Sequence, residues 1–316
     1  MTLPQEIETH IERFSDQLDQ FIDIKASLTL SLTLIDQSAQ HTEGPVYLPA
    51  EDSVVWSDVV GDRILKYKDG KVSVFKQPAR YQNGNALDLE GRIVGCSHRD
   101  RAIVRQEHSG EWQILVDRCD NKRLNSPNDI TVKSDGTIWF TDPSFGLTSP
   151  NEGCGGQQEQ FGSFVFRFDP ATEEIDAVIK EMERPNGLAF SPDEQLLYVS
   201  DTSAVVNPSL LHHILVYDIV NGRTAKNGRV FAEVSPGEPD GFCLDTHGNL
   251  FTSAADGVHI YSPSGDLLGK IKTPEICANL TFGGKDRDRL FITAGNSLYS
   301  IQLKTRGITQ QTRNIS

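Results

Sequence analysis

Six oxygen-bearing side chains recur along the chain, each where a short apolar run begins. They lie 39 to 58 residues apart and are Glu43, Asn85, Asn128, Asn186, Asp240 and Asn279. Carboxylate and amide oxygens are the ligands that Ca²⁺, Mg²⁺ and Mn²⁺ prefer, whereas thiolates and imidazoles would indicate zinc or copper. Two buried carboxylates would also be costly without a cation beside them. If the fold brings these side chains to one point, they predict a divalent metal site.

Each of these residues is, taken alone, also typical of a turn. Asn or Asp before Gly is common where a chain enters a strand, as in Asn186-Gly187 and Asp240-Gly241. Six such residues in register are harder to obtain from independent turn preferences. The pattern therefore favours ligands over six separate turns.

The elements that would position these residues form an internal repeat. Each oxygen-bearing residue is followed by an apolar run, a polar turn and a second apolar run, as in PNDITVKSDGTIWFTDPSFG from Pro127 and PNGLAFSPDEQLLYVSDT from Pro185. A third and a fourth run follow, such as Phe164–Phe168 and Ile175–Ile179. Repeats of about 40 to 50 residues built from short strands are typical of propellers. We expect an all-β fold, a six-bladed β-propeller with four strands per blade and a short N-terminal helix.

The N-terminal segment differs from the repeats. Ile7, Ile11, Phe14, Leu18 and Phe21 recur at steps of four and three, which predicts an amphipathic helix. Such a helix would either lie on the propeller wall or join two copies of the chain in a homodimer. The stretch from Ser27 to Leu34 alternates strictly and predicts a strand that closes the ring by joining the last blade. The expected domains are a helical extension, 1–26, and a catalytic propeller, 27–316.

A second group of polar residues is expected around the mouth of the propeller. The second strand of each blade returns to the face where the first strand starts, so its last residues should surround that mouth: Asp58, His98, Asp142 and Asp201. A lone histidine is more often structural than catalytic, and Asp142 before Pro143 is also typical of a turn. His98 and Asp142 are therefore candidates for substrate contacts, together with Asn85 from the first group.

Composition and missing motifs exclude several functions. A net charge of -14 argues against nucleic-acid binding, and no run of about 18 apolar residues could cross a membrane. Five cysteines without C-x-x-C spacing, behind a start that lacks a secretory signal, predict a cytoplasmic protein. The sequence has no G-x-S-x-G, H-E-x-x-H, Walker or G-x-G-x-x-G motif. Metal-assisted chemistry is the reaction class that remains.

From Glu43 to Leu303 the chain resembles the gluconolactonase and regucalcin (senescence marker protein) family of six-bladed propeller lactonases. The resemblance is carried by EGPVY at Glu43, RLNSPNDI with TDPSFG downstream, RPNGLAFSPD at Arg184, PDGFCLDTHGNLF at Pro239 and ANLTFGG. It implies a metal ion held by Glu43, Asn128, Asn186 and Asp240, with Ca²⁺ expected and Mg²⁺, Mn²⁺ or Zn²⁺ as alternatives. It also implies that Asp240 acts as general base while a sugar lactone is opened to its hydroxy acid.

One position departs from the family pattern. Some relatives carry a basic residue two positions before the asparagine of the ND pair, where this chain has Ser126, and the nearest arginine is Arg123. Arg123 is therefore a further candidate for substrate contact. Two other functions stay open: hydrolysis of phosphotriesters or of a wider range of lactones at the same metal site, and a non-catalytic propeller that serves as a binding platform.

Overall fold

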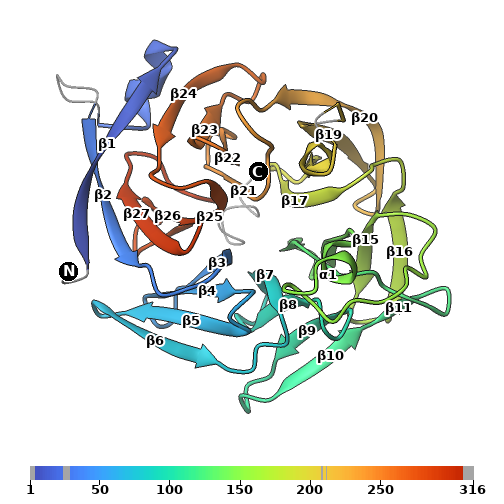
Figure 1. The fold of residues 1–316 in the computed structure, drawn as a ribbon. Helices are drawn as coiled ribbons and strands as arrows, with labels where there is room; N and C mark the ends of the chain where they lie inside the picture. The colour runs from blue at the N-terminus through green and yellow to red at the C-terminus, as the bar shows by residue number, and fades with distance from the viewer. Residues whose placement is uncertain (1–3, 24–28, 208, 211, 309–316) are drawn as a thin grey trace.

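The chain folds into β-sheets arranged around a common centre (Figure 1). The computed structural model describes residues 4–23, 29–207, 209–210 and 212–308. In this part of the chain the helices are α1 (Phe145–Thr148) and two 3₁₀-helices, η1 (Asp16–Gln20) and η2 (Ser203–Val205). None of the described helices has the length and hydrophobicity needed to span a membrane. The all-β class predicted from the repeats is confirmed.

Four of the sheets contain four antiparallel strands each, in chain order from the centre outwards. The first is β3 (Thr42–Leu48), β4 (Ser53–Asp58), β5 (Arg63–Lys68) and β6 (Lys71–Lys76). The second is β7 (Gln82–Leu87), β8 (Ile93–Ser97), β9 (Ala102–Gln106) and β10 (Trp112–Val116). The third is β13 (Ile130–Val132), β14 (Ile138–Asp142), β15 (Phe164–Asp169) and β16 (Glu174–Ile179). The fourth is β17 (Pro185–Phe190), β18 (Leu196–Asp201), β19 (His213–Val220) and β20 (Thr224–Glu233), and a separate short pair is β11 (Arg118–Cys119) with β12 (Lys122–Arg123).

The remaining strands form one nine-stranded sheet in the order β21-β22-β23-β24-β1-β2-β27-β26-β25. Its members are β21 (Phe242–Leu244), β22 (Leu250–Ala254), β23 (Gly257–Tyr261), β24 (Leu267–Lys272), β1 (Gln5–Arg13), β2 (Thr29–Asp36), β27 (Ser297–Gln302), β26 (Arg289–Ala294) and β25 (Cys277–Gly283). β2 pairs with β27, with Thr33 opposite Ser300. The predicted strand that joins the end of the chain to its beginning is thereby confirmed.

The predicted N-terminal helix is wrong over residues 5–13, which form β1. Ile7 and Ile11 are four positions apart, a spacing that fits a helix and a strand equally well. The alternation of buried Thr9 and Ile11 with exposed Glu8 and His10 fits only a strand. β1 pairs with β2 over its first part and with β24 over its last three residues, so it belongs to the sheet of its own chain. A homodimer formed through an N-terminal helix thus loses its structural basis.

The hydrophobic core lies between neighbouring sheets. One cluster joins Trp139 and Val165 of the third sheet to Phe190 and Tyr217 of the fourth. The rings of Trp139 and Phe190 meet edge to face with their centroids 5.3 Å apart. Because each sheet is covered on both faces by its neighbours, inner strands such as β3 and β14 are buried along their whole length.

A charged cluster on β23 and β24 predicts an acid-dependent loss of stability. Burial alone would raise the pKa of Asp256, but the side chains of Lys272, His259 and Lys270 around it lower the pKa to about 2. The folded protein therefore favours the ionised form of Asp256. The contribution of Asp256 to the free energy of unfolding is complete above about pH 4 and disappears as the pH falls towards 2. We expect Asp256→Asn to cost about 2 kcal/mol in free energy of unfolding at pH 6 and much less near pH 2.

Urea unfolding of the two proteins at pH 6, 4 and 3 would measure this difference. The exposed Asp266, in the turn before β24, supplies a control, because Asp266→Asn makes the same change and leaves the Asp256 cluster intact. A difference between wild type and Asp256→Asn that stays constant over this pH range would contradict the expected role of the cluster.

Candidate active site

The starts of the innermost strands are tied to one another by hydroxyl groups. The residue before the last position of the second strand donates a hydrogen bond to a backbone carbonyl of the next sheet in three places: Ser57 to Asn83 at 2.7 Å, Thr141 to Asn186 at 2.6 Å and Ser200 to Asp240 at 2.7 Å. These bonds cross from one sheet to its neighbour near the centre. In two of the three, the accepting carbonyl belongs to an oxygen-bearing residue of the ring, Asn186 or Asp240.

Glu43, Asn186 and Asp240 come together at this centre, as the sequence predicted. Glu43 and Asn186 are buried and Asp240 is partly buried. The side chain of Asn186 hydrogen-bonds to Asp240, and the negative charge of Glu43 raises the pKa of Asp240. A side chain at Gly187 would lie 2.3 Å from the carbonyl oxygen of Asp240, so a glycine is required where these strands approach.

Asn128, the remaining predicted ligand, lies in the same ring. It is buried, and its backbone carbonyl accepts a hydrogen bond from the amide of Gly84 at 2.8 Å. The backbone N–H of Asn128 donates a hydrogen bond to the backbone carbonyl of Thr141 at 2.9 Å. The backbone is thus held on both sides while the side chain is left outside these bonds.

Three carboxylates near the centre have raised pKa values. Burial, only partly offset by hydrogen bonds from Gly44 and Asn279, raises the pKa of Glu43 to about 7. Burial and the neighbouring charge of Glu43 raise the pKa of Asp129 to about 7 as well. The pKa of Asp240 lies well above its usual value, first through burial and then through the charges of Glu43 and Asp129. The site therefore gathers three acidic groups whose ionised forms are disfavoured by burial and by one another.

This donor set fits a hard divalent cation. Carboxylate oxygens from Glu43 and Asp240 and amide oxygens from Asn128 and Asn186 are ligands of the Ca²⁺ type. Within the described residues, no three His, Cys, Asp or Glu side chains are grouped as a metal site. A metal here would therefore need the two asparagines, which agrees with a hard ion and argues against a zinc site of His and Cys ligands.

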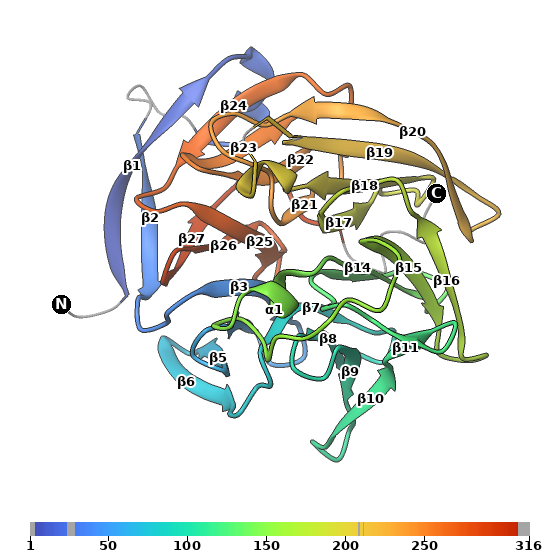
Figure 2. The ribbon, with the colours of Figure 1, turned by 45° about the vertical axis from the view of Figure 1, so that its right-hand side comes forward.

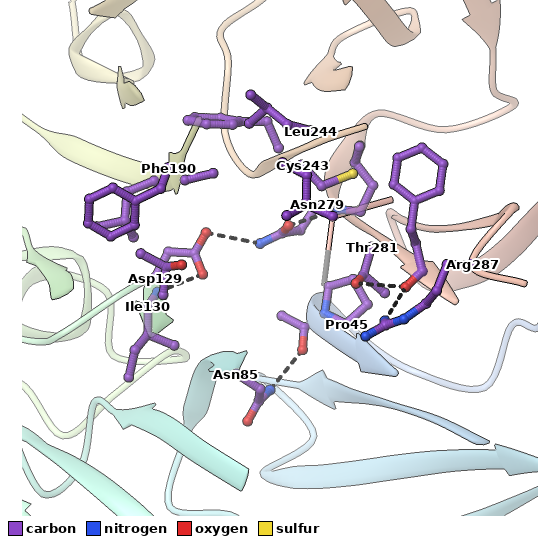
Figure 3. A pocket seen from close by; sticks show the side chains of 18 residues that line it. Pro45, Asn85, Asp129, Ile130, Phe190, Cys243, Leu244, Asn279, Thr281 and Arg287 are labelled. Atoms are coloured by element: carbon purple, nitrogen blue, oxygen red, sulfur yellow. Dashed lines mark hydrogen bonds between the residues drawn. The ribbon is translucent and has the colours of Figure 1, made fainter. Parts of the chain in front are cut away.

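Asp129 and Asn279 form a partition below the mouth (Figure 3). The amide nitrogen of Asn279 lies 3.2 Å from Oε2 of Glu43 and 3.4 Å from Oδ2 of Asp129. Asp129 and Asn279 also line a cavity of about 150 Å³, whose wall includes Ile130, Phe190, Phe242 and Arg287. Glu43 is not part of that wall. The partition therefore lies between the Glu43 carboxylate and this cavity.

A segment inserted between β14 and β15, residues 143–162, covers part of the mouth, and we call it the cap segment. Figure 2 shows its helix α1 on the inner side of the ring, beside β7 and β8. Ser126 donates to the carbonyl of Pro143 at 2.7 Å and accepts from the amide of Gly146 at 3.0 Å. Ser126 therefore holds the start of the cap segment. Glu152 in this segment lies close enough to raise the pKa of both Glu43 and Asp240.

His98 lies beneath the cap segment and is 1% exposed. Its Nδ1 is 2.7 Å from the carbonyl oxygen of Glu152, and a carbonyl can only accept, so Nδ1 carries the proton. Nε2 then presents a lone pair, and it has no partner among the described residues. Burial lowers the pKa of His98 to about 4, so the ring is neutral at physiological pH.

Two more of the predicted substrate contacts, Asn85 and Asp142, have structural partners. The amide nitrogen of Asn85 donates to the carbonyl of Gly44 at 2.8 Å and to Ser57 Oγ at 2.9 Å, which joins the first two sheets. Asp142 is fully buried, and its Oδ2 accepts the backbone N–H of Asn125 at 2.7 Å. Burial raises the pKa of Asp142 to about 8. Both side chains thus hold the strands and segments around the site.

Arg123 also has structural partners. Its guanidinium donates to the carbonyl of Asp100 at 2.9 Å, and its backbone N–H donates to the carboxylate of Glu159 in the cap segment at 2.9 Å. Asp100 follows β8, and Glu159 belongs to the far end of the cap segment. Arg123 therefore connects the cap segment to the second sheet.

Sequence reasoning missed Asp129 and Glu152. For Asp129 a signal exists: the residue after the ring member is Gly in Asn186-Gly187 and Asp240-Gly241 but Asp in Asn128-Asp129. Glycine also follows Glu43, so the carboxylate of Asp129 stands where three of its five counterparts have glycine. Glu152 has no such signal, because its position depends on how the cap segment folds back to His98.

Comparison with known proteins connects this geometry to a family. Residues 41–296 match the family model of the SMP-30/Gluconolactonase/LRE-like region. The chain is 31% identical to a gluconolactonase from Zymomonas mobilis over 94% of this chain and 87% of the relative. It is 29% identical to a 6-deoxy-6-sulfogluconolactonase from Pseudomonas putida, over 83% of this chain and 85% of the relative.

Comparison with solved structures shows similarity to the same family. A gluconolactonase from Xanthomonas campestris superposes with a TM-score of 0.87 at 38% identity, covering 96% of this chain and 98% of that one. A regucalcin from Agrobacterium tumefaciens superposes with a TM-score of 0.70 at 17% identity, covering 86% and 94%, and shares the fold. The chain belongs to the SMP-30/gluconolactonase/LRE-like family of propeller-type proteins.

Proposed function

We propose that this protein is a metal-dependent lactone hydrolase that opens a sugar lactone, such as gluconolactone, to its hydroxy acid. The observation that carries the proposal is the grouping of Glu43, Asn186 and Asp240 at the mouth, with pKa values of both carboxylates raised. Relatives named gluconolactonase and sulfogluconolactonase, which align over most of the chain, support this substrate class.

Glu43, Asn128, Asn186 and Asp240 would hold the cation. A bound divalent ion would polarise the lactone carbonyl and, as a neighbouring positive charge, favour the ionised form of Asp240. The Asp240 carboxylate then accepts a proton from the attacking water while the water oxygen bonds to the carbonyl carbon. The bond between that carbon and the ring oxygen breaks, and the ring oxygen takes up a proton to become the hydroxyl of the product.

The chain's own side chains would bind and orient the lactone. The unpaired Nε2 of His98 is an acceptor buried beneath the cap segment, so a hydrogen bond from a sugar hydroxyl would require this segment to shift. The cap segment lies over the mouth and would restrict access of bulk water.

The five cysteines are free thiols, which supports our expectation of a reducing, cytoplasmic compartment.

We interpret the nine-stranded sheet as two four-stranded blades joined by β1. In this interpretation β21–β24 form one blade, and β25–β27 with β2 form another. Together with the four separate four-stranded sheets they give a six-bladed propeller. The ring of oxygen-bearing residues then contains one member from every blade.

Removal of divalent cations is expected to abolish hydrolysis of gluconolactone. The donor set contains oxygens alone, so Ca²⁺, Mg²⁺ or Mn²⁺ added back should restore the rate. The melting temperature should also rise when Ca²⁺ is added to the metal-free protein, because a ligand that binds the folded state stabilises it. Chelator already saturated with Ca²⁺ serves as the control. Full activity in excess EDTA would contradict a metal-dependent reaction.

A substrate panel separates this function from its alternatives. Gluconolactone, an acyl-homoserine lactone and a phosphotriester would be assayed with the same metal-loaded protein. We expect the highest kcat/KM with gluconolactone. Turnover of the phosphotriester alone would overturn the proposal, and turnover of none would favour a binding platform.

A further inference from the structure

Asn279 is the one member of the ring whose side chain touches two of the raised-pKa carboxylates. It lies in β25 and is 6% exposed. Its amide nitrogen faces Glu43 Oε2 at 3.2 Å and Asp129 Oδ2 at 3.4 Å, so both N–H groups are directed at carboxylates. Glu43 and Asp129 are far from Asn279 in the chain, and the amide connects them. Figure 3 shows its hydrogen bond to Asp129.

The orientation of this amide is fixed. Oδ1 of Asn279 accepts the backbone N–H of Leu280 at 2.8 Å, so the NH₂ group must point to the opposite side. The backbone is also held, because Thr293 Oγ1 accepts from the N–H of Asn279 at 3.1 Å and donates to its carbonyl at 2.9 Å. A Cβ at Gly241 would lie 2.0 Å from Cγ of Asn279, so the backbone beside Asp240 closes the remaining space.

These contacts give the two oxygens of Glu43 different roles. Among the described residues, the hydrogen bonds to the Glu43 carboxylate come from Gly44 N–H at 2.9 Å and from Asn279, and both end on Oε2. Oε1 of Glu43 therefore stays available to bind a cation at the mouth. The amide oxygen of Asn279 is committed to Leu280, so Asn279 itself is unsuited to be a ligand.

We infer that Asn279 is a positioning residue that orients the Glu43 carboxylate for the cation and joins it to Asp129. This inference rests on the proposed metal site. A hydrogen-bond partner behind a ligand fixes the direction of its free oxygen, and loss of such a partner typically weakens metal binding about 10- to 100-fold. It also leaves two buried carboxylates without the donor that they share.

The test compares two buried asparagines. Asn249, 3% exposed in the turn between β21 and β22, donates to Asp245 Oδ2 at 2.8 Å and so also serves a carboxylate, but outside the mouth. Calorimetric titration of the metal-free proteins with CaCl₂ should show Asn279→Leu binding Ca²⁺ about 10- to 100-fold more weakly than wild type. Asn249→Leu should bind as wild type does, although both substitutions should lower the melting temperature measured in EDTA.

If Asn279→Leu does not fold, Asn279→Ser is measured instead, since its smaller hydroxyl can donate to one carboxylate at most. We expect its Ca²⁺ affinity to fall about tenfold. A folded Asn279 variant that binds Ca²⁺ within twofold of wild type would overturn the inference, because a purely structural role lowers stability and leaves affinity unchanged. Wild-type protein that binds neither Ca²⁺, Mg²⁺ nor Mn²⁺ would instead overturn the proposed metal site, and the inference would fall with it.

Discussion

Replacement of Asp240 by asparagine is expected to lower kcat/KM for gluconolactone by about 10²- to 10⁴-fold, the range typical for loss of a general base. Asparagine has nearly the same shape but cannot accept a proton from water. Its amide also contributes no negative charge to the group formed by Glu43, Asp129 and Asp240. The measurement is a stopped or pH-indicator assay of lactone opening with the metal at saturation, corrected for spontaneous hydrolysis.

The control for this variant is Asp266→Asn, the same change at an exposed residue of the same region. It should retain the wild-type rate. If Asp240→Asn keeps more than about a tenth of wild-type kcat/KM, Asp240 is not the general base, because water alone could not replace a base of that strength.

Replacement of Trp139 by alanine is expected to lower the free energy of unfolding more than Asp256→Asn or Trp112→Ala does. Trp139 is fully buried, its Nε1 donates to Thr137 at 3.0 Å, and its ring fills the space between the third and fourth sheets against Phe190. Removing a buried tryptophan costs about 3–5 kcal/mol, from lost burial and from the cavity that remains. For a chain of this size the melting temperature should fall by roughly 5–10 °C.

Thermal unfolding followed by circular dichroism would show this change. Trp112 offers a matched control, because it is only half-buried and one face of its ring is covered by the ammonium of Lys76 at 3.6 Å. Trp112→Ala should shift the melting temperature much less. Equal shifts for the two variants would mean that contacts between the third and fourth sheets are not a main source of stability.

The strands of the sheets could be predicted because their signals are local. The fourth run of the third repeat, Ile175–Ile179, is β16 with one residue added at its start. The turn at Asp135-Gly136 has the positive φ, +87°, that the glycine predicts. Alternation and turn residues act over a few positions, so a single sequence suffices to identify them.

The N-terminal segment could not be predicted in this way. Its apolar spacing fits a helix, but its partners are β2 and the distant β24, where Ile11 lies opposite Ile271. Pairing with two strand edges outweighs a local preference for helix. The second of these edges, β24, lies more than 250 residues away in the sequence.

The proximity of the candidate residues could be predicted from the repeat, whereas the contacts of their side chains could not. Side-chain type and register placed Glu43, Asn186 and Asp240 together, because these depend on the repeat. The direction of each side chain depends on its neighbours, which is why Asn85 binds Gly44 and Ser57 and Asp142 binds Asn125. The partition made by Asp129 and Asn279 requires contacts between three different sheets, and no local pattern encodes such contacts.

The position of β1 and β2 has a consequence for synthesis on the ribosome. Residues 5–36 leave the ribosome well before their partners, β24 and β27, at residues 267–272 and 297–302. β1 and β2 must therefore wait, with unpaired strand edges, until more than 250 further residues have emerged. Such edges are open to pairing with other chains during this delay. Chaperone binding to the first forty residues is thus expected to matter more for the yield of folded protein than binding to any later segment.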